Sequence, residues 1–322
     1  MCFSCKPLLK AIDAYLAKAD DDLEEALEDE GYCEPKKTVK TISELEDEIS
    51  EALLEETDYF LSAAEKAVDL DTFAKEIWPG IVLNDELRAK LALIFMERFT
   101  EFVPEFAEYY VKATDKGLKV KKVSKRTTAW IKNWSEELAD IMQLNSHKEI
   151  ERILNKGLED GIGIEEFTRN IMDSGIRDEH YKARRTAVTE VLTAHRAAQQ
   201  EAFVQSPAVE EKMWRHTGIY IHKPRRNHKD MDGQRVPVSE PYELTGADGG
   251  KYYPMFPGDT TLPPGERIEC HCISQGIVSE TILGLSLEER KRLQQEALNE
   301  ADENWEAELE ARNKAMVGYT EE

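Results

Sequence analysis

The sequence predicts an α+β fold, in which a mostly helical N-terminal two-thirds leads into a small α+β region and then a helical tail. Two observations support this prediction. Apolar residues recur at helical spacing over most of the first 205 residues, and residues 286–316 again have a helical pattern. Between residues 212 and 278, short β-prone runs alternate with prolines and glycines, which is typical of a few strands joined by long loops.

The first two helices are predicted from apolar periodicity and from the residues at their ends. A helix over residues 6–30 would end at Gly31, since glycine commonly follows the last helical residue. Thr41 and Glu44 form a capping-box pattern, which predicts the start of a second helix there. The Pro–Gly pair at 79–80 would break that helix.

The middle of the chain is predicted to hold three further helices and a link. Asn84 is the expected N-cap of a third helix, and a lysine-rich connection over 115–126 follows it. A helix over 128–142 comes next. Ser146 and Glu149 repeat the capping-box pattern, which predicts a separate helix beginning there.

The last helices lie on both sides of the α+β region. A short helix is expected over 164–174 and a longer one over 177–205. Ser286 and Glu289 form a third capping box, which begins the tail helix. Because this tail is polar nearly all round, it is either a solvated helix or one that docks on a partner.

Charge is unevenly distributed along the chain. Lys and Arg number 42, and Asp and Glu number 65, which gives a net charge of −23. Residues 181–278 hold 13 basic and 12 acidic residues and are therefore nearly neutral. This balance argues against a protein that binds DNA over its whole surface. There is no run of 18 apolar residues and no signal-peptide pattern, so we expect no membrane partner and synthesis in a reducing cytoplasm.

Five cysteines fit poorly with a disulfide framework. Cys2 and Cys5 form a Cys-x-x-Cys near the N-terminus, with Cys33 as a possible third ligand, and exposed thiols are the favoured interpretation there. Cys270 and Cys272 form a Cys-x-Cys. On a strand, residues two apart point to the same face, so both sulfurs would face one point.

A series of motifs in the second half occurs in a fixed order. They are Thr189-Glu190-Val191, Trp214, His228 with Asp232-Gly233, Val236-Pro237 with Pro241-Tyr242, and Cys270-His271-Cys272. In this order they resemble the phage Mu F-type head-morphogenesis family, and the preceding helices extend the resemblance over about residues 125–278. The sequence departs from the family at His271, where an arginine or a similar residue is expected, and in the number of basic residues before His228.

The resemblance implies a phage minor head protein with a structural role in procapsid assembly, and not an enzyme. The implied partners are the portal protein, capsid or scaffold proteins, and packaged double-stranded DNA. The protein would be assembled in the host bacterial cytoplasm and reside in the phage head. The corresponding domains are a helical N-terminal region over 1–124, a Mu F-like head-morphogenesis domain over 125–284 and a polar helical tail over 285–322.

The Cys-x-Cys and His228 together suit a metal ion. Two thiolates and an imidazole are ligands of tetrahedral zinc, and Asp232 is one candidate for the fourth position. The other candidates for the fourth position are His222, His271 and His195. A structural zinc ion would stabilise a small loop-rich region. The alternative interpretation is two buried thiols beside a hydrogen-bonded structural histidine.

Separately, we expect Glu190 to anchor the β region through a backbone or arginine contact.

Basic side chains gather in the sequence around His228. They are Lys223, Arg225, Arg226, Lys229 and Arg235. They would contact DNA phosphates or an acidic face of the portal, or else form a solvated loop. A second basic run over 116–126 is suited to the same role.

The alternative function is a metal-dependent hydrolase, a nuclease or a toxin-like effector, using His228, Asp232, Cys270 and Cys272. A catalytic zinc needs an open position and a general base, and no glutamate lies at a fixed short spacing from these residues. A DNA-binding adaptor built on the helices at 147–174 is a third candidate, which their acidic residues oppose.

Overall fold

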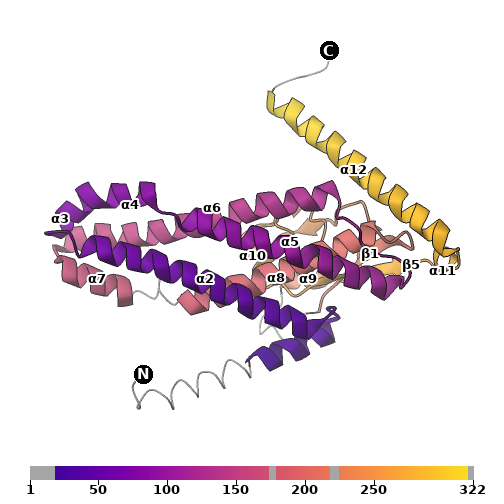
Figure 1. The fold of residues 1–322 in the computed structure, drawn as a ribbon, viewed down its shortest axis with the longest axis horizontal. Coiled ribbons are helices and arrows are strands. Elements are labelled where there is room, and N and C mark those ends of the chain that lie inside the picture. Colours follow the sequence, from indigo (N-terminus) through magenta and orange to yellow (C-terminus); the bar gives the residue numbers. More distant parts are fainter. Residues whose placement is uncertain (1–18, 174–178, 218–224, 318–322) are drawn as a thin grey trace. The chain divides into compact units, whose positions relative to one another are not determined.

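The structure, a computed structural model, describes residues 19–173, 179–217 and 225–317 (Figure 1). The predicted α+β class is confirmed, because long helices dominate and a small antiparallel sheet lies in the C-terminal half. Among the helices in these ranges, none combines the length and the apolar character needed to cross a membrane.

A helix over residues 19–30 precedes eight helical elements that lead up to the sheet region. In chain order these are α2 (Pro35–Ala64), α3 (Leu70–Thr72), the π-helical turn η1 (Phe73–Ile77), α4 (Trp78–Asn84), α5 (Leu87–Thr114), α6 (Lys125–Asp160), α7 (Ile164–Asp173) and α8 (Glu179–Val204).

The described residues form two compact units that alternate along the chain. Within the described ranges, the first comprises residues 19–42, 101–128, 189–217 and 225–317, and the second comprises residues 43–100, 129–173 and 179–188. Helices α2, α5, α6 and α8 each contribute residues to both units. The compact units therefore follow packing, and they are not the same as the sequence ranges 1–124, 125–284 and 285–322.

The helix over 19–30 ends where the sequence predicts. Gly31 has φ +85°, in the left-handed region that glycine enters without a steric penalty. The Tyr32 N–H then donates to the Leu27 carbonyl at 2.9 Å, which is the hydrogen bond of a Schellman motif.

Two prolines begin helices that the sequence analysis placed elsewhere. Pro35 is the first residue of α2, so the Thr41 and Glu44 pattern lies inside the helix and the expected start there is wrong. Pro79 lies in the first turn of α4, directly after η1, so the expected break at 79–80 is also wrong. The first turn of a helix leaves its N–H groups without intrahelical partners, which is why proline is tolerated there.

Two expected N-caps are corrected as well. Asn84 is the last residue of α4, and Asp85 caps α5 by accepting the Leu87 N–H at 2.9 Å. Helix α6 continues without interruption past Ser146, whose hydroxyl instead donates to Glu56 at 2.9 Å. A capping box is a local pattern, and a packed helix of sufficient length overrides it.

Other helix predictions are confirmed. Helices α7 and α8 match the ranges 164–174 and 177–205 to within two residues wherever the structure describes them. The tail helix is α12 (Leu287–Val317), and the Ser286 hydroxyl accepts the Glu289 N–H at 3.2 Å as the capping box predicts.

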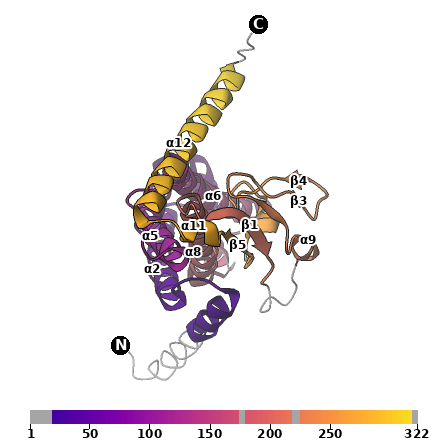
Figure 2. The same cartoon turned by 90° about the vertical axis from the view of Figure 1, so that its right-hand side faces the viewer.

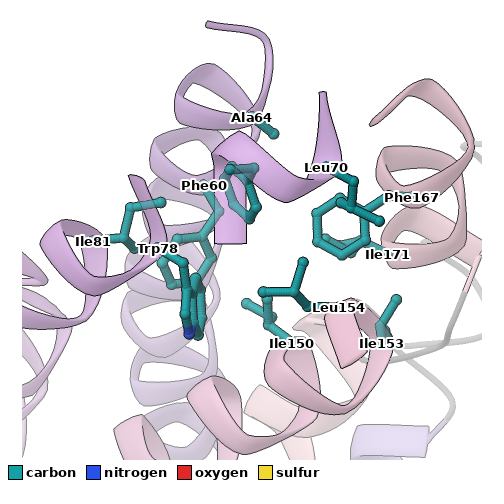
Figure 3. Close-up of a cluster of buried hydrophobic side chains, with 11 residues drawn as sticks. Phe60, Ala64, Leu70, Trp78, Ile81, Ile150, Ile153, Leu154, Phe167 and Ile171 are labelled. Atoms are coloured by element: carbon teal, nitrogen blue, oxygen red, sulfur yellow. The ribbon is translucent and has the colours of Figure 1, made fainter. Parts of the chain in front are cut away.

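The second unit is held together by an aromatic and aliphatic core (Figure 3). Phe60 of α2 packs against Trp78, with ring centroids 5.8 Å apart, and Phe73 packs against Phe167 at 5.4 Å. The buried members of this core are Phe60, Ala64, Leu70, Phe73, Trp78, Ile81, Ile150, Ile153, Leu154, Phe167 and Ile171.

In the first unit, the C-terminal part of α8 is buried on every side. All residues from 189 to 203 are buried, which is the pattern of a helix enclosed by a domain core. Alanines allow close packing, while the polar residues of this stretch must find partners inside the protein. Several of those partners belong to the candidate site described below.

The sheet region follows α8 and belongs to the first unit (Figure 2). Its three-stranded antiparallel sheet has the order β2-β1-β5, and a two-stranded hairpin is formed by β3 and β4. The elements are β1 (Val209–Arg215), α9 (Arg226–Asp230), β2 (Arg235–Pro237), β3 (Leu244–Thr245), β4 (Lys251–Tyr252), α10 (Pro264–Arg267), β5 (Ile273–Val278) and α11 (Glu280–Leu283). Arg215 pairs with Ile273 at the end of the ladder that joins β1 to β5.

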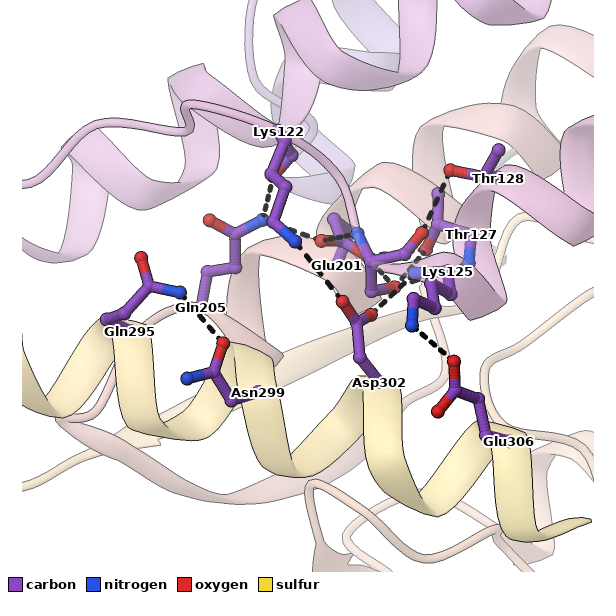
Figure 4. Close-up of polar contacts among 11 residues, drawn as sticks. Lys122, Lys125, Thr127, Thr128, Glu201, Gln205, Gln295, Asn299, Asp302 and Glu306 are labelled. Atoms are coloured by element: carbon purple, nitrogen blue, oxygen red, sulfur yellow. Dashed lines mark hydrogen bonds and ion pairs between the residues drawn. The ribbon is translucent and has the colours of Figure 1, made fainter.

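Helix α12 docks on the lysine-rich connection of its own unit (Figure 4). Asp302 accepts the Lys125 N–H at 2.7 Å and Lys122 Nζ at 3.3 Å, and Glu306 pairs with the Lys125 ammonium group. The middle of the tail therefore packs on its own chain, which differs from both expectations, a solvated helix and a helix that docks on a partner. The same contacts engage part of the basic run over 116–126 within the chain.

Candidate functional site

Three potential metal ligands meet in the core of the sheet region. His228 comes from α9, and Cys270 and Cys272 come from the segment just before β5; all three are buried. The Nδ1 atom of His228 lies 3.6 Å from the Cys270 sulfur and 3.7 Å from the Cys272 sulfur. The structure thus brings together the three residues that the sequence analysis selected from two distant motifs.

The Cys-x-Cys segment is extended, and its side chains alternate. Both sulfurs face His228, while the intervening His271 faces the other way and its Nδ1 lies 2.9 Å from Glu30 Oε2. The prediction that both thiols point to one side is confirmed, although the pair precedes the strand and does not belong to it. His271 is held by Glu30, and the structure does not bring it into the cluster.

The second ring nitrogen of His228 is fixed by a buried carboxylate. His228 Nε2 lies 2.9 Å from Glu266 Oε2, and the other oxygen of Glu266 accepts the Ala247 N–H at 2.7 Å. Burial alone would raise the pKa of Glu266, but hydrogen bonds from Ala247 and Asn227 lower it, so the carboxylate is ionised. With Nε2 donating its proton to Glu266, Nδ1 presents a lone pair to the sulfurs.

His216 is a neighbour of the cluster that the sequence analysis missed. Its Nδ1 lies 3.3 Å from the Cys272 sulfur. The pairing of Arg215 with Ile273 explains this position, because the next residues along the same antiparallel register are His216 and Cys272. Strand pairing was needed to find this contact, and the sequence alone does not give it.

The other candidates for a fourth ligand have different roles. Asp232 is exposed and accepts the backbone N–H of His216 at 2.9 Å, so its carboxylate lies outside the cluster. His195 is buried elsewhere in the unit, with Tyr110 at 2.9 Å on one ring nitrogen and the Cys33 carbonyl at 3.1 Å on the other. Burial lowers the pKa of His195 to about 3, so it is neutral and structural. His222 lies outside the described residues.

Arg196 of α8 holds the Cys-x-Cys segment from behind. Its guanidinium group is buried and donates to the carbonyl of Cys270, to the Pro257 carbonyl at 3.2 Å and to the Tyr32 hydroxyl at 3.0 Å. Gly258 has φ +77°, and a side chain there would come within 2.0 Å of Arg196. Glycine at this position therefore leaves room for the arginine.

The two thiols share their ionisation. A hydrogen bond with Cys272 lowers the pKa of Cys270, assisted by His228 and by the positive charge of Arg196. The same hydrogen bond raises the pKa of Cys272, because it then lies beside a thiolate. In the absence of a bound cation, this arrangement favours one thiolate and one thiol.

The cluster lies in a region of the chain that is similar to a known protein family. The family model described as "Phage Mu protein F like protein" matches residues 148–275. An uncharacterized protein of Bacillus subtilis (strain 168), YqbB, is 34% identical over 303 residues, which is 90% of this chain and 97% of that relative. The chain belongs to the phage Mu F-like family. No solved structure matches it.

Family membership places the protein among phage head-morphogenesis proteins. The matched region contains His216, His228, Cys270 and Cys272, and also Arg196, which supports them. It begins inside α6, so the Mu F-like match covers the end of one helical element together with α7, α8 and most of the sheet region.

The basic residues of the Mu F-like region do not form one free surface. Arg225 donates to the Gly265 carbonyl at 2.7 Å and to the Ile268 carbonyl at 2.6 Å, so it clamps α10. The exposed members of the predicted set are Arg226, Lys229 and Arg235. Lys223 lies outside the described residues.

Among the N-terminal cysteines, Cys33 is described by the structure, and it lies outside this cluster. Cys2 and Cys5 lie outside the described residues. Cys33 is half-buried beside His195, and burial raises the pKa of its thiol to about 11, which makes it a poor metal ligand and a poor nucleophile.

A second group of potential ligands lies in the second unit. His147 Nε2 lies 2.6 Å from Asp85 Oδ2, and Glu56 completes the group. Asp85 also caps α5, and Glu56 accepts the Ser146 hydroxyl. These hydrogen bonds account for the group as a polar contact between helices of that unit.

The predicted anchoring of Glu190 by an arginine is confirmed. Arg267 of α10 donates to Glu190 at 2.8 Å, and both side chains are buried. The pair ties α8 to the turn that precedes Cys270. Together with Arg196, it fixes the position of the Cys-x-Cys relative to α8.

Proposed function

We propose that this Mu F-like protein is a minor head protein that acts in procapsid assembly, with the portal protein as its partner. Membership of the family carries the proposal. The likeness to YqbB extends over 97% of that relative, so the shared architecture includes the N-terminal helices as well as the matched region. The protein would reside in the phage head, where capsid or scaffold proteins are its further neighbours.

The distribution of charge supports a protein contact in preference to a DNA contact. A chain with a net charge of −23 repels nucleic acid at long range. At physiological salt, exposed charges interact over only about 8 Å, so a small basic set can still bind a facing acidic surface. We assign this role to Arg226, Lys229 and Arg235, which would meet an acidic face of the portal.

Co-purification with the portal protein of the same phage genome tests the proposal. The tagged full-length chain is expected to retain the portal, and the triple variant R226E/K229E/R235E is expected to retain several-fold less. The matched control is K66E/K75E/K156E, which reverses three exposed lysines elsewhere and should bind as well as the wild type.

Two results would count against the proposal. One is a chain that retains no portal and whose gene can be deleted without changing the composition of procapsids. The other is retention of DNA in place of the portal, lost in the same R226E/K229E/R235E variant. The second result would leave a head component that contacts packaged DNA.

A further inference from the structure

Four nitrogen and sulfur atoms in the sheet region have the chemistry of a zinc site. The distances from His228 Nδ1 to the sulfurs of Cys270 and Cys272 are 3.6 and 3.7 Å. Ligands at ordinary Zn–S and Zn–N distances, at two corners of a tetrahedron, lie about 3.6 Å apart. His228 Nδ1 is thus already spaced from each sulfur as two ligands of one tetrahedral ion are, and all three donor atoms lie within 4.8 Å of one another.

We propose that Cys270, Cys272, His228 and His216 bind one zinc ion as a closed structural site. His216 supplies the fourth ligand because its Nδ1 already contacts the Cys272 sulfur at 3.3 Å. His216 does not yet lie within 4.8 Å of all three other donor atoms, so its partly buried ring would turn toward the ion on binding. Four protein ligands fill the coordination sphere, which leaves no position for a catalytic water.

The surroundings of His228 match those of a metal-bound histidine. Such histidines commonly donate their second N–H to a carboxylate, which fixes the ring and makes it a better ligand. Glu266 provides this contact at 2.9 Å, is itself buried and is held by the Ala247 N–H. Glu266 therefore acts as a positioning residue for the ion and does not bind it.

Charge balance also favours the ion. Two thiolates and two neutral imidazoles carry a charge of −2, which Zn²⁺ cancels in a buried setting; binding releases the protons of the thiols to solvent. The site would join the end of β1, helix α9 and the segment before β5. These three pieces are separated by the long loops of the sheet region, which a metal staple would hold closed.

Elemental analysis of the purified full-length chain is the first test. Protein produced with zinc in the medium and purified with a reductant is expected to carry about one zinc per chain, as a four-ligand site requires. The Cys270→Ser variant should lose the zinc, and Cys33→Ser, which changes a cysteine outside the cluster, should keep it. A wild-type chain with essentially no zinc would overturn the proposal.

Cobalt substitution of the wild-type chain keeps the proposal testable if Cys270→Ser does not fold. Co²⁺ bound by two thiolates in a tetrahedral site gives sulfur-to-metal charge-transfer absorption and intense visible bands. Their presence supports the assigned ligands, and a spectrum of octahedral Co²⁺ contradicts them. Because His216 is a ligand here, H216Q should weaken these bands, while H271Q should leave them unchanged.

The role of Glu266 has a separate readout. The E266Q variant is expected to bind zinc about 10- to 100-fold more weakly in competition with a chelator. A variant that loses stability but keeps wild-type zinc affinity would show that Glu266 serves the fold alone. None of these outcomes bears on portal binding, so the zinc site and the proposed function stand or fall separately.

Discussion

At the scale of single residues, the unusual feature is how many charged side chains are buried around α8. Glu190, Arg196 and Glu201 are each almost fully enclosed, yet each has partners from other elements. An unpaired buried charge would cost several kcal/mol, so these residues specify which loops may pack on the helix. They act as specific attachment points within an alanine-rich surface.

The first prediction concerns the buried pair of Glu190 and Arg267. Replacing Glu190 with Gln leaves the arginine charge buried without its carboxylate, and we expect the free energy of unfolding to fall by about 3 kcal/mol. Urea denaturation measures this value. The control is Glu243→Gln, whose exposed pair with Lys251 is screened by solvent, so the free energy of unfolding should stay close to that of the wild type. Equal stability of E190Q and the wild type would contradict the anchoring role.

The second prediction concerns Lys212, which is fully buried in β1 and donates to Gln200 Oε1 at 3.0 Å. Burial lowers its pKa from 10.5 to about 7. Between pH 7 and 10.5 the unfolded chain therefore binds more protons at this residue than the folded chain does. Stability then rises with pH over this window, with a slope approaching about 1.4 kcal/mol per pH unit.

The comparison with Lys212→Met isolates this effect, because other titrating groups are common to both proteins. The stability of the wild type relative to K212M should rise between pH 7 and 10 and be flat below pH 6, where the lysine is charged in both states. Denaturation at a series of pH values measures the difference. A difference that is constant across the whole range would show that the buried ammonium group keeps its ordinary pKa.

At the scale of elements, the sequence predicted the existence of the helices better than their ends. Helix α6 contains the capping-box pattern of Ser146 and Glu149, yet the helix continues past Ser146 without a break. The Pro79–Gly80 pair predicts a helix break, but Pro79 lies in the first turn of α4. Both errors arise because caps and prolines are local signals, while helix length is set by the core against which the helix packs.

The candidate site was partly predictable for a related reason. Cys270, Cys272 and His228 are recognisable as ligand types from the sequence, and the structure places them together. His216 and Glu266 were not identified, because their roles depend on the register of β1 with β5 and on the position of α10. Neither the strand register nor the position of α10 can be read from a single sequence, because both depend on contacts between distant segments.

The third prediction concerns the docking of α12. Asp302 receives a backbone N–H and a lysine, so Asp302→Ala should release the middle of the helix. Hydrogen bonds to a charged group contribute about 1.5–3 kcal/mol, and we expect amide exchange in residues 295–310 to accelerate accordingly. Glu303→Ala, an exposed neighbour on the same helix, is the control. Unchanged exchange in D302A would mean that the other contacts of the helix, such as the pair of Glu306 with Lys125, suffice to hold the tail.

At the scale of the whole molecule, two compact units share four continuous helices. Each unit has a core of its own: aromatic residues around Phe73 in one, and the surroundings of Trp214 in the other. The proposed zinc ion lies in the core around Trp214, which belongs to the first unit. Removing the zinc should therefore destabilise the first unit before the second.

The fourth prediction follows from this arrangement. Removing zinc with a chelator in the presence of a reductant should increase amide exchange in residues 209–278, because the metal closes the loops of the sheet region. Residues 145–171, which belong to the other core, should exchange as before. Hydrogen–deuterium exchange with mass spectrometry measures both regions in one experiment. An equal increase in both would show that the metal stabilises the protein globally.

The alternation of the units along the chain limits how the protein can be dissected. A fragment restricted to residues 148–275 would start inside α6 and would lack Tyr32, which binds Arg196, and Glu30, which binds His271. It would also lack Ser124, whose N–H and hydroxyl satisfy Glu201. The matched region thus depends on N-terminal residues outside its boundaries. If residues 148–275 were transferred to another protein, residues 27–33 and 115–128 would have to be transferred with them.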